Sequence, residues 1–170
     1  WRGDYDLTQH QKFSGQDLAY TDPSTHEKYL PHIVECSSGV DRPFFYLLLD
    51  AYQEEKLENG ETRIFLKINP HLAAYKLAIF PLASNKPELL KLSQKLYKDL
   101  SQKYSIDYDD SSNIGKKYRR QDEIGTPYCV TVDFETLEDE MVTVRDRDTM
   151  TQERVKISEL ESYFAKNLKN

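Results

Sequence analysis

The chain contains 170 residues with a formal net charge of −6 at pH 7, and 31% of its residues are charged while 38% are hydrophobic. This length allows one domain of typical size together with part of another, and the apolar content is sufficient for a modest core. The acidic balance argues against a nonspecific nucleic-acid binder, because such proteins depend on many phosphate contacts from Lys and Arg, whereas specific recognition of a folded RNA stays open.

The cysteines and the lack of long apolar runs constrain the cellular location. Cys36 lies in a polar turn and Cys129 in an apolar run, so a reduced pair is favoured over a disulfide. No apolar stretch approaches the ~18–20 residues of a membrane span, and the first residues lack the apolar part of a signal peptide. We therefore predict a cytoplasmic protein without a membrane partner. Trp1 in place of an initiator methionine indicates an excerpt from a longer protein.

The first third of the chain shows little regular periodicity. Residues 1–30 are polar and rich in turn signals, so irregular or extended structure is expected there. Residues 32–38 predict a buried strand, and residues 40–53 predict a helix. That helix is apolar on nearly every side, which indicates that it packs inside something larger than this fragment. The charged stretch 53–60 is interpreted as a solvent loop.

From Tyr75 onward, strands and helices alternate. Residues 76–81 and 106–108 predict two short strands. Between them, Pro87 starts a helix whose apolar residues recur every three or four positions. Residues 113–125 predict a basic helix that ends at a glycine.

Three strands and a last helix complete the pattern. The strands are expected at 128–133, 141–145 and 154–157, the second with the alternation typical of a β-strand. A helix capped at Ser158 closes the chain. The order β-α-β-α-β-β-β-α, without any internal repeat, predicts an α/β fold with a mixed, about five-stranded sheet flanked by helices.

The segment from Glu35 to Arg42 carries the first candidate site. It places a carboxylate, two hydroxyls and an arginine at a predicted strand-to-helix turn, where Gly39 allows a sharp bend. Arg42 is expected in the first helical turn, where the helix dipole also favours anions. Such a turn suits an amino acid and a phosphate. Two simpler interpretations stay open, namely an ion pair of Arg42 with Asp41 or Asp50 and a structural ion pair of Glu35.

Other reactive residue types carry less information. Asp4, Asp6 and His10 have the chemistry of metal ligands, but their spacing matches no fixed zinc geometry, so structural hydrogen bonding is the favoured interpretation. Cys129 is interpreted as a small core residue. A Cys–His nucleophile is disfavoured because no histidine follows His71.

Charged residues also gather in the second half of the chain. A basic cluster on the predicted 113–125 helix is interpreted as a contact to RNA phosphates, with the solvated face of a helix as the simpler alternative. It consists of Lys116, Lys117, Arg119 and Arg120. Asp122 and Glu123 either read bases or pair with neighbouring side chains. The run 145–148 alternates in sign, which also fits a cross-strand charge ladder.

Several stretches resemble class II aminoacyl-tRNA synthetases. The Gly39–Arg42 turn is similar to the end of their motif 3, and the Glu35–Ser37 lead-in resembles the glycyl branch. Residues 75–168 resemble the C-terminal anticodon-binding domain shared by glycyl, histidyl, prolyl and threonyl enzymes, most clearly over 112–128. Two more stretches are similar to glycyl enzymes, namely 2–10 and 142–150. The resemblance covers essentially the whole chain.

This resemblance implies a domain order and a reaction. Residues 1–56 are then the end of the antiparallel-sheet catalytic domain, 57–74 a linker and 75–170 the anticodon-binding domain. The full-length protein is expected to be a homodimeric glycine–tRNA ligase that joins glycine to tRNA(Gly) with ATP and Mg²⁺, mainly by positioning and charge stabilisation. No segment resembles motif 1 or motif 2, so the chain alone is expected to be inactive.

The resemblance also assigns residues. Arg42 contacts the ATP phosphates as the catalytic arginine, and Glu35 and Ser37 line the glycine pocket, with Glu35 also near ATP. Cys36 stands where proline is expected. The anticodon contacts are assigned to Lys116, Arg119, Arg120, Asp122, Glu123, Arg145, Asp146 and Arg147. Glycine anticodons share cytosine at two positions, and carboxylates suit the N4 amino group of cytosine. The alternatives are a noncatalytic accessory module that binds nucleic acid and a related synthetase for another amino acid.

Overall fold

The computed structural model describes residues 1–168, and the chain divides into two compact units, Trp1–Pro43 and Phe44–Asn170. The first unit contains helix α1 (Tyr5–Ser14) and a short antiparallel hairpin. The strands of that hairpin are β1 (Tyr20–Thr21) and β2 (Lys28–Tyr29).

The sequence predictions for the first unit are corrected at two places. Irregular structure over 1–30 is wrong along α1, which buries none of its residues and therefore lacks the apolar stripe that reveals a helix. The helix ends at Gly15, which has φ 69° and forms a left-handed cap. The glycine itself is the sequence signal for this helix end. The buried strand predicted at 32–38 is also wrong, because Ile33 forms a single bridge and Val34 is 72% exposed.

Helix α2 (Asp41–Ala51) agrees with the predicted helix. Its aromatic side chains Phe44, Phe45 and Tyr46 are 57–64% exposed, and Leu49 is 59% exposed. The expectation that the described chain leaves apolar faces of this helix uncovered is therefore confirmed.

A second hairpin follows α2 directly. Strand β3 (Tyr52–Lys56) pairs antiparallel with β4 (Thr62–Leu66), so the solvent loop predicted over 53–60 is wrong. Strand β3 is exposed along its whole length and rich in charged residues of low β-propensity, which hides it from a search for apolar periodicity. The Asn59-Gly60 turn, where Gly60 has φ 82°, is the signal that reveals the hairpin.

The second unit is built on a mixed five-stranded sheet with the order β6-β5-β7-β8-β9. Strand β5 runs parallel to β6 and β7, and β8 runs antiparallel to β7 and β9. The strands are β5 (Leu77–Pro81), β6 (Ile106–Tyr108), β7 (Tyr128–Val132), β8 (Met141–Asp146) and β9 (Gln152–Lys156). The predicted α/β fold with a mixed sheet is confirmed.

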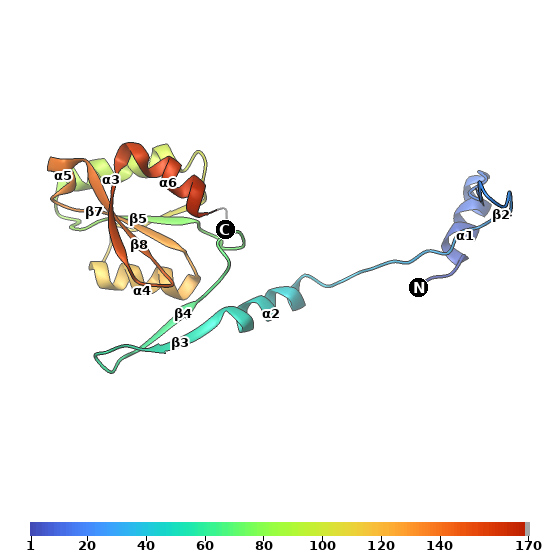
Figure 1. Cartoon of the computed structure of the whole chain (residues 1–170), viewed down its shortest axis with the longest axis horizontal. Helices are drawn as coiled ribbons and strands as arrows, with labels where there is room; N and C mark the ends of the chain where they lie inside the picture. The colour runs from blue at the N-terminus through green and yellow to red at the C-terminus, as the bar shows by residue number, and fades with distance from the viewer. Residues whose placement is uncertain (169–170) are drawn as a thin grey trace. The chain divides into compact units, whose positions relative to one another are not determined.

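Helices cover both faces of this sheet. Figure 1 shows α3 (Pro87–Leu100) and α6 (Leu160–Asn167) on one face and α4 (Ile114–Ile124) on the other. A short helix, α5 (Thr136–Asp139), joins β7 to β8. The closing helix is present as predicted, but a 3₁₀ turn leads into it and, in the described chain, no side chain caps α6, so the cap expected from Ser158 is wrong. Within residues 1–168, every helix is too short or too polar to span a lipid bilayer.

The alternation of side chains along β5 decides which helix packs on which face. Leu77 and Ile79 join the large core that α3 and α6 complete. Ala78 and Phe80 point to the opposite face, where Tyr118 of α4 packs against them. All of β5 is buried, and α4 covers one of its faces with both apolar and polar side chains, since Lys117, Gln121 and Asp122 of α4 are buried as well.

Candidate nucleic-acid interface

The residues assigned to glycine and ATP are exposed in the structure. The Glu35 carboxylate lies 3.5 Å from the guanidinium of Arg2, which also pairs with Asp6 at 2.7 Å. Ser37 and Arg42 are exposed, and Arg42 stands in the first turn of α2 as expected. The roles of Glu35, Ser37 and Arg42 stay predictions.

The carboxylate of Asp6 near the N-terminus serves as a hydrogen-bond acceptor. Asp6 accepts two hydrogen bonds from Arg2, and these bonds lower the pKa of Asp6 below its usual range. Within residues 1–168, no group of His, Cys, Asp or Glu side chains is arranged to hold a metal ion. Cys36 and Cys129 are both free, and burial raises the pKa of the Cys129 thiol, in accord with its place in the core.

Helix α4 carries most of the residues assigned to RNA, and both of its ends are defined by side-chain chemistry. Asn113 caps its start by accepting a hydrogen bond from the backbone N–H of Lys116 at 3.0 Å. Gly125 ends it with φ 82°. A Cβ at Gly125 would lie 2.8 Å from Cδ1 of Ile68, so a glycine is required by both conformation and space.

The basic cluster of α4 does not form one continuous surface. Lys117 is fully buried and its Nζ donates to the carbonyl of Pro81 at 2.9 Å. Burial lowers the pKa of Lys117. Arg120 pairs with Asp109 at 2.6 Å, which leaves Lys116 and Arg119 as the exposed basic side chains without such a pair in the described chain.

The carboxylate of Asp122 is the centre of a buried ion cluster. Arg145 donates to both of its oxygens, at 2.8 and 3.0 Å, and Arg63 donates to Oδ2 at 3.0 Å. All three side chains are only 6–7% exposed. Burial opposes the charge of Arg145, but its bonds to Asp122 outweigh burial and raise the pKa of the guanidinium. The guanidinium of Arg145 also lies 4.9 Å from the ring centre of Tyr118.

The residues after Arg145 are engaged within the protein as well. Arg147 is buried, and its guanidinium donates to the carbonyl of Gly125 at 2.7 Å and to Asp148 at 2.8 Å. Asp146 accepts from the backbone and hydroxyl of Thr149 and so closes a turn. Because these contacts run to α4 and within the turn rather than between paired strands, the cross-strand charge ladder is wrong.

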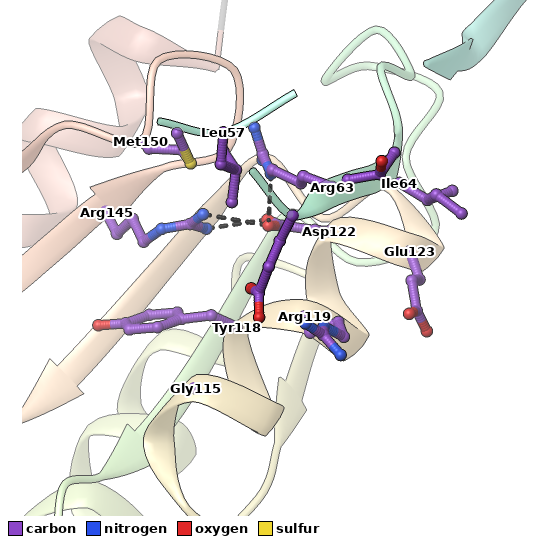
Figure 2. A pocket seen from close by; sticks show the side chains of 12 residues that line it. Leu57, Arg63, Ile64, Gly115, Tyr118, Arg119, Asp122, Glu123, Arg145 and Met150 are labelled. Carbon is purple, nitrogen blue, oxygen red and sulfur yellow. Dashed lines mark hydrogen bonds and ion pairs between the residues drawn. The ribbon is translucent and has the colours of Figure 1, made fainter. Parts of the chain in front are cut away.

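A cavity of about 290 Å³ opens where these groups meet (Figure 2). Helix α4, the β3–β4 hairpin and the end of β8 line it together. Its charged lining residues are three cations, Arg63, Arg119 and Arg145, and three anions, Glu61, Asp122 and Glu123. Tyr118 and Met150 add aromatic and sulfur surface, so the cavity offers donors, acceptors and apolar contacts in a small space.

The structure brings four of the eight residues assigned to RNA into or beside this cavity. Arg119, Asp122, Glu123 and Arg145 line it, whereas Lys116, Arg120, Asp146 and Arg147 do not. Arg63, Tyr118 and Met150 are lining residues that sequence reasoning missed. For Arg63, the alternation of buried and exposed positions along β4 is the signal, which the interpretation of the hairpin as loop and linker concealed.

The comparisons with known proteins agree with this arrangement. The family model of the anticodon binding domain matches residues 76–167, which contain the five-stranded sheet and α4. The chain belongs to the anticodon-binding domain family.

Similar proteins extend the likeness beyond that domain. A glycine–tRNA ligase of Clostridium beijerinckii is 54% identical over 170 residues, which are 98% of this chain and 35% of that protein. A glycine–tRNA ligase of Borreliella burgdorferi is 52% identical over 171 residues, 99% of this chain and 38% of that protein. The chain thus spans little more than a third of the length of these curated relatives.

A solved structure supports the fold independently. The prolyl-tRNA synthetase of Cryptosporidium parvum, solved with L-proline and AMP, matches 61% of this chain and 22% of its own with a TM-score of 0.57 and 28% sequence identity. The resemblance to aminoacyl-tRNA synthetases inferred from the motifs is confirmed by these matches.

Proposed function

We propose that this chain binds the anticodon of a tRNA, with one unstacked nucleotide entering the cavity between α4 and the β3–β4 hairpin. Membership of the anticodon-binding domain family is the observation that carries the proposal. A site for a single-stranded base needs an aromatic or planar cationic surface, together with donors and acceptors for the base edge. Tyr118, Arg119 and Glu123 supply these at the cavity.

The structure separates the predicted acceptors by how much of their hydrogen-bonding capacity remains. Asp122 already accepts from two arginines, and Asp146 accepts from Thr149. Glu123 is exposed, lines the cavity and has no hydrogen-bond partner within the described residues. Glu123 is therefore the carboxylate best placed to accept from the N4 amino group of a cytosine.

The basic side chains take a different role. Arg119 and Lys116 are exposed on α4 and bind phosphate, and Arg119 is also placed to stack on a base at the rim of the cavity. Arg145 is buried in its pair with Asp122, and Arg120 is held by its pair with Asp109. The net negative charge of the chain suits recognition of particular bases better than general attraction to RNA.

For the whole protein we propose a glycine–tRNA ligase of the cytoplasm that acts as a homodimer and uses ATP and Mg²⁺. Relatives of 52–54% identity over almost all of this chain carry that name. Arg42 fits a phosphate, because its exposed guanidinium stands in the first turn of α2 where the helix dipole favours anions. Glu35 and Ser37 supply the acceptors that a glycine ammonium requires.

Binding of anticodon stem-loops tests the proposal. The wild-type chain is titrated with a stem-loop that carries the glycine anticodon and with versions that carry single C→U changes. The wild type is expected to prefer cytosine, and Glu123→Gln is expected to reduce that preference by ~1–3 kcal/mol at one position. Glu138→Gln, an exposed glutamate of α5 outside the cavity, is the matched control. Equal affinity of the wild type for all stem-loops would overturn the proposal.

A further inference from the structure

The β3–β4 hairpin forms one wall of the cavity. It contributes the lining residues Leu57, Glu61, Thr62, Arg63 and Ile64. All of them precede the segment that the family model matches, which begins at residue 76. The opposite wall comes from α4 and the end of β8, so the cavity exists only while the hairpin is held against α4 (Figure 2).

Arg63 makes the polar connections that hold the hairpin there. Its Nε donates to Asp122 of α4 at 3.0 Å and its Nη2 donates to the backbone carbonyl of Arg147 at 2.5 Å, while its Nη1 donates to Glu55 within the hairpin at 3.2 Å. The guanidinium also lies 4.2 Å from the ring centre of Phe65. Three donors on one planar group fix both the place and the orientation of the side chain, which a lysine ammonium would not do.

The same contacts orient Arg145. Oδ2 of Asp122 accepts from Arg63 and from Arg145, so the two guanidiniums share one oxygen and fix the plane of the carboxylate. Arg145 alone spans both oxygens, and the third donor, from Arg63, adds a restraint on the terminal torsion of the carboxylate, which otherwise has broad minima. A residue from a distant segment therefore helps to position the guanidinium of Arg145 beside the cavity.

We infer that Arg63 is a positioning residue for RNA binding, and that the β3–β4 hairpin belongs to the binding unit together with the anticodon-binding domain. This inference rests on the proposed function. Arg63 is buried and acts through Asp122 and Arg145, and it also keeps the hairpin wall opposite Arg119 and Glu123. The ligand is a single-stranded nucleotide of the anticodon.

Two variants and a matched control test the inference in the full chain. Arg63→Gln removes the charge and two of the three donors, and Arg63→Lys keeps the charge without the planar fork. Arg154→Gln is the control, because Arg154 is a partly buried arginine that pairs with Asp133 and Asp139 and does not line the cavity. The Kd for the glycine anticodon stem-loop is measured at a temperature where circular dichroism shows each variant fully folded.

The expected result is a Kd at least tenfold higher for Arg63→Gln, little rescue by Arg63→Lys, and a Kd within twofold of wild type for Arg154→Gln. A ¹⁵N–¹H spectrum of the Arg145 guanidinium supplies a readout that loss of stability alone does not change. We expect its signals to shift or broaden in Arg63→Gln and to stay unchanged in Arg154→Gln. A double variant with Asp122→Asn should bind about as weakly as the weaker single variant, since the residues act as one unit.

The outcomes distinguish this inference from the proposed function. If the wild type binds the stem-loop and folded Arg63→Gln binds it within twofold, the positioning role is overturned while the proposed function stands. Unchanged Arg145 signals in Arg63→Gln overturn the role as well, whatever the affinity. If the wild type binds no anticodon stem-loop, the proposed function fails and the inference fails with it.

Discussion

Arg63 and Asp122 are 59 positions apart in the sequence, yet Nε of the arginine donates a 3.0 Å hydrogen bond to the carboxylate of the aspartate. The contact joins the β3–β4 hairpin to α4, and Arg145 shares the same carboxylate. Two buried cations thus share one buried anion, although Arg63 also pairs with Glu55. Removing the Asp122 carboxylate leaves Arg145 without an anionic partner in a poorly solvated place, which is costly.

The first prediction follows from this cluster. Asp122→Ala should lower the free energy of unfolding by about 3–5 kcal/mol, because both guanidiniums lose their shared acceptor. Urea denaturation followed by circular dichroism measures it. Glu138→Gln, an exposed change elsewhere, should stay within about 0.5 kcal/mol of wild type. A loss below 1 kcal/mol for Asp122→Ala would show that the cluster contributes little to stability.

The two glycines of the α4 region should respond to alanine in opposite ways. Gly125→Ala meets a left-handed conformation with φ 82° and a contact of 2.8 Å to Ile68, so a loss of about 1–3 kcal/mol is expected. Gly115 is helical, and its nearest neighbour to a new Cβ, Asn113, lies at 3.8 Å, so Gly115→Ala should gain about 0.5–1 kcal/mol. Thermal melts of both variants compare the effects, and a stabilising Gly125→Ala would contradict the structure.

Acid should weaken the fold through Asp133. Burial opposes its ionisation, but hydrogen bonds from Arg154 at 2.5 Å and from Thr136 at 2.8 Å outweigh burial and hold the pKa of Asp133 below its usual range. Because the folded pKa is the lower one, the ionised carboxylate stabilises the fold above the usual Asp value of about 3.9. That contribution is lost as the pH falls from about 4 through the folded pKa.

Asp133→Asn tests this pH dependence. The variant should be less stable than wild type at pH 7, and the difference should shrink below pH 4 as the wild-type carboxylate takes up its proton. Urea unfolding at pH 7 and pH 3 gives both differences. A stability difference that is the same at the two pH values would assign the effect of the variant to packing instead of charge.

A fourth prediction concerns Arg42 in a protein of the relatives' full length that contains this chain. Arg42→Ala should suppress glycine-dependent ATP–pyrophosphate exchange about a hundredfold or more, because a charged hydrogen bond to a phosphate in a dry site contributes ~3 kcal/mol. Binding of the anticodon stem-loop should remain nearly unchanged. Exchange within a few-fold of wild type would remove Arg42 from the ATP site.

The sequence predicted those helices and strands that are stabilised by buried apolar side chains. Helix α3 repeats leucines every three or four residues and strand β5 is an apolar run, so the apolar pattern predicts both elements. Helix α1 and strand β3 bury no residue and are held by caps and backbone pairing, which leave no apolar pattern. Because β3 was missed, the hairpin stayed outside the predicted anticodon-binding domain.

The candidate site shows the same division. Residue types on α4 were recognisable as donors and acceptors, but sequence alone does not tell which of them the fold already uses. The carboxylate of Asp122 already accepts a hydrogen bond from Arg63, which lies in a segment interpreted as linker. The carboxylate of the adjacent Glu123 is exposed and remains available to a ligand. Pairings across such distances follow from tertiary packing, and no local rule predicts them.

Lys116 and Lys117 are neighbours in the chain, yet one side chain is exposed and the other is fully buried against the carbonyl of Pro81. Reagents that acylate amines will therefore modify Lys116 readily and reach Lys117 only when α4 detaches from the sheet. In a proteolytic peptide that carries both amines, mass spectrometry can follow the modification of each lysine. The modification of Lys117 then measures the opening of α4, and that of Lys116 serves as the internal standard. If RNA protects Lys116 and leaves the modification of Lys117 unchanged, the protection reports RNA bound to the exposed surface of α4 and no change in helix opening.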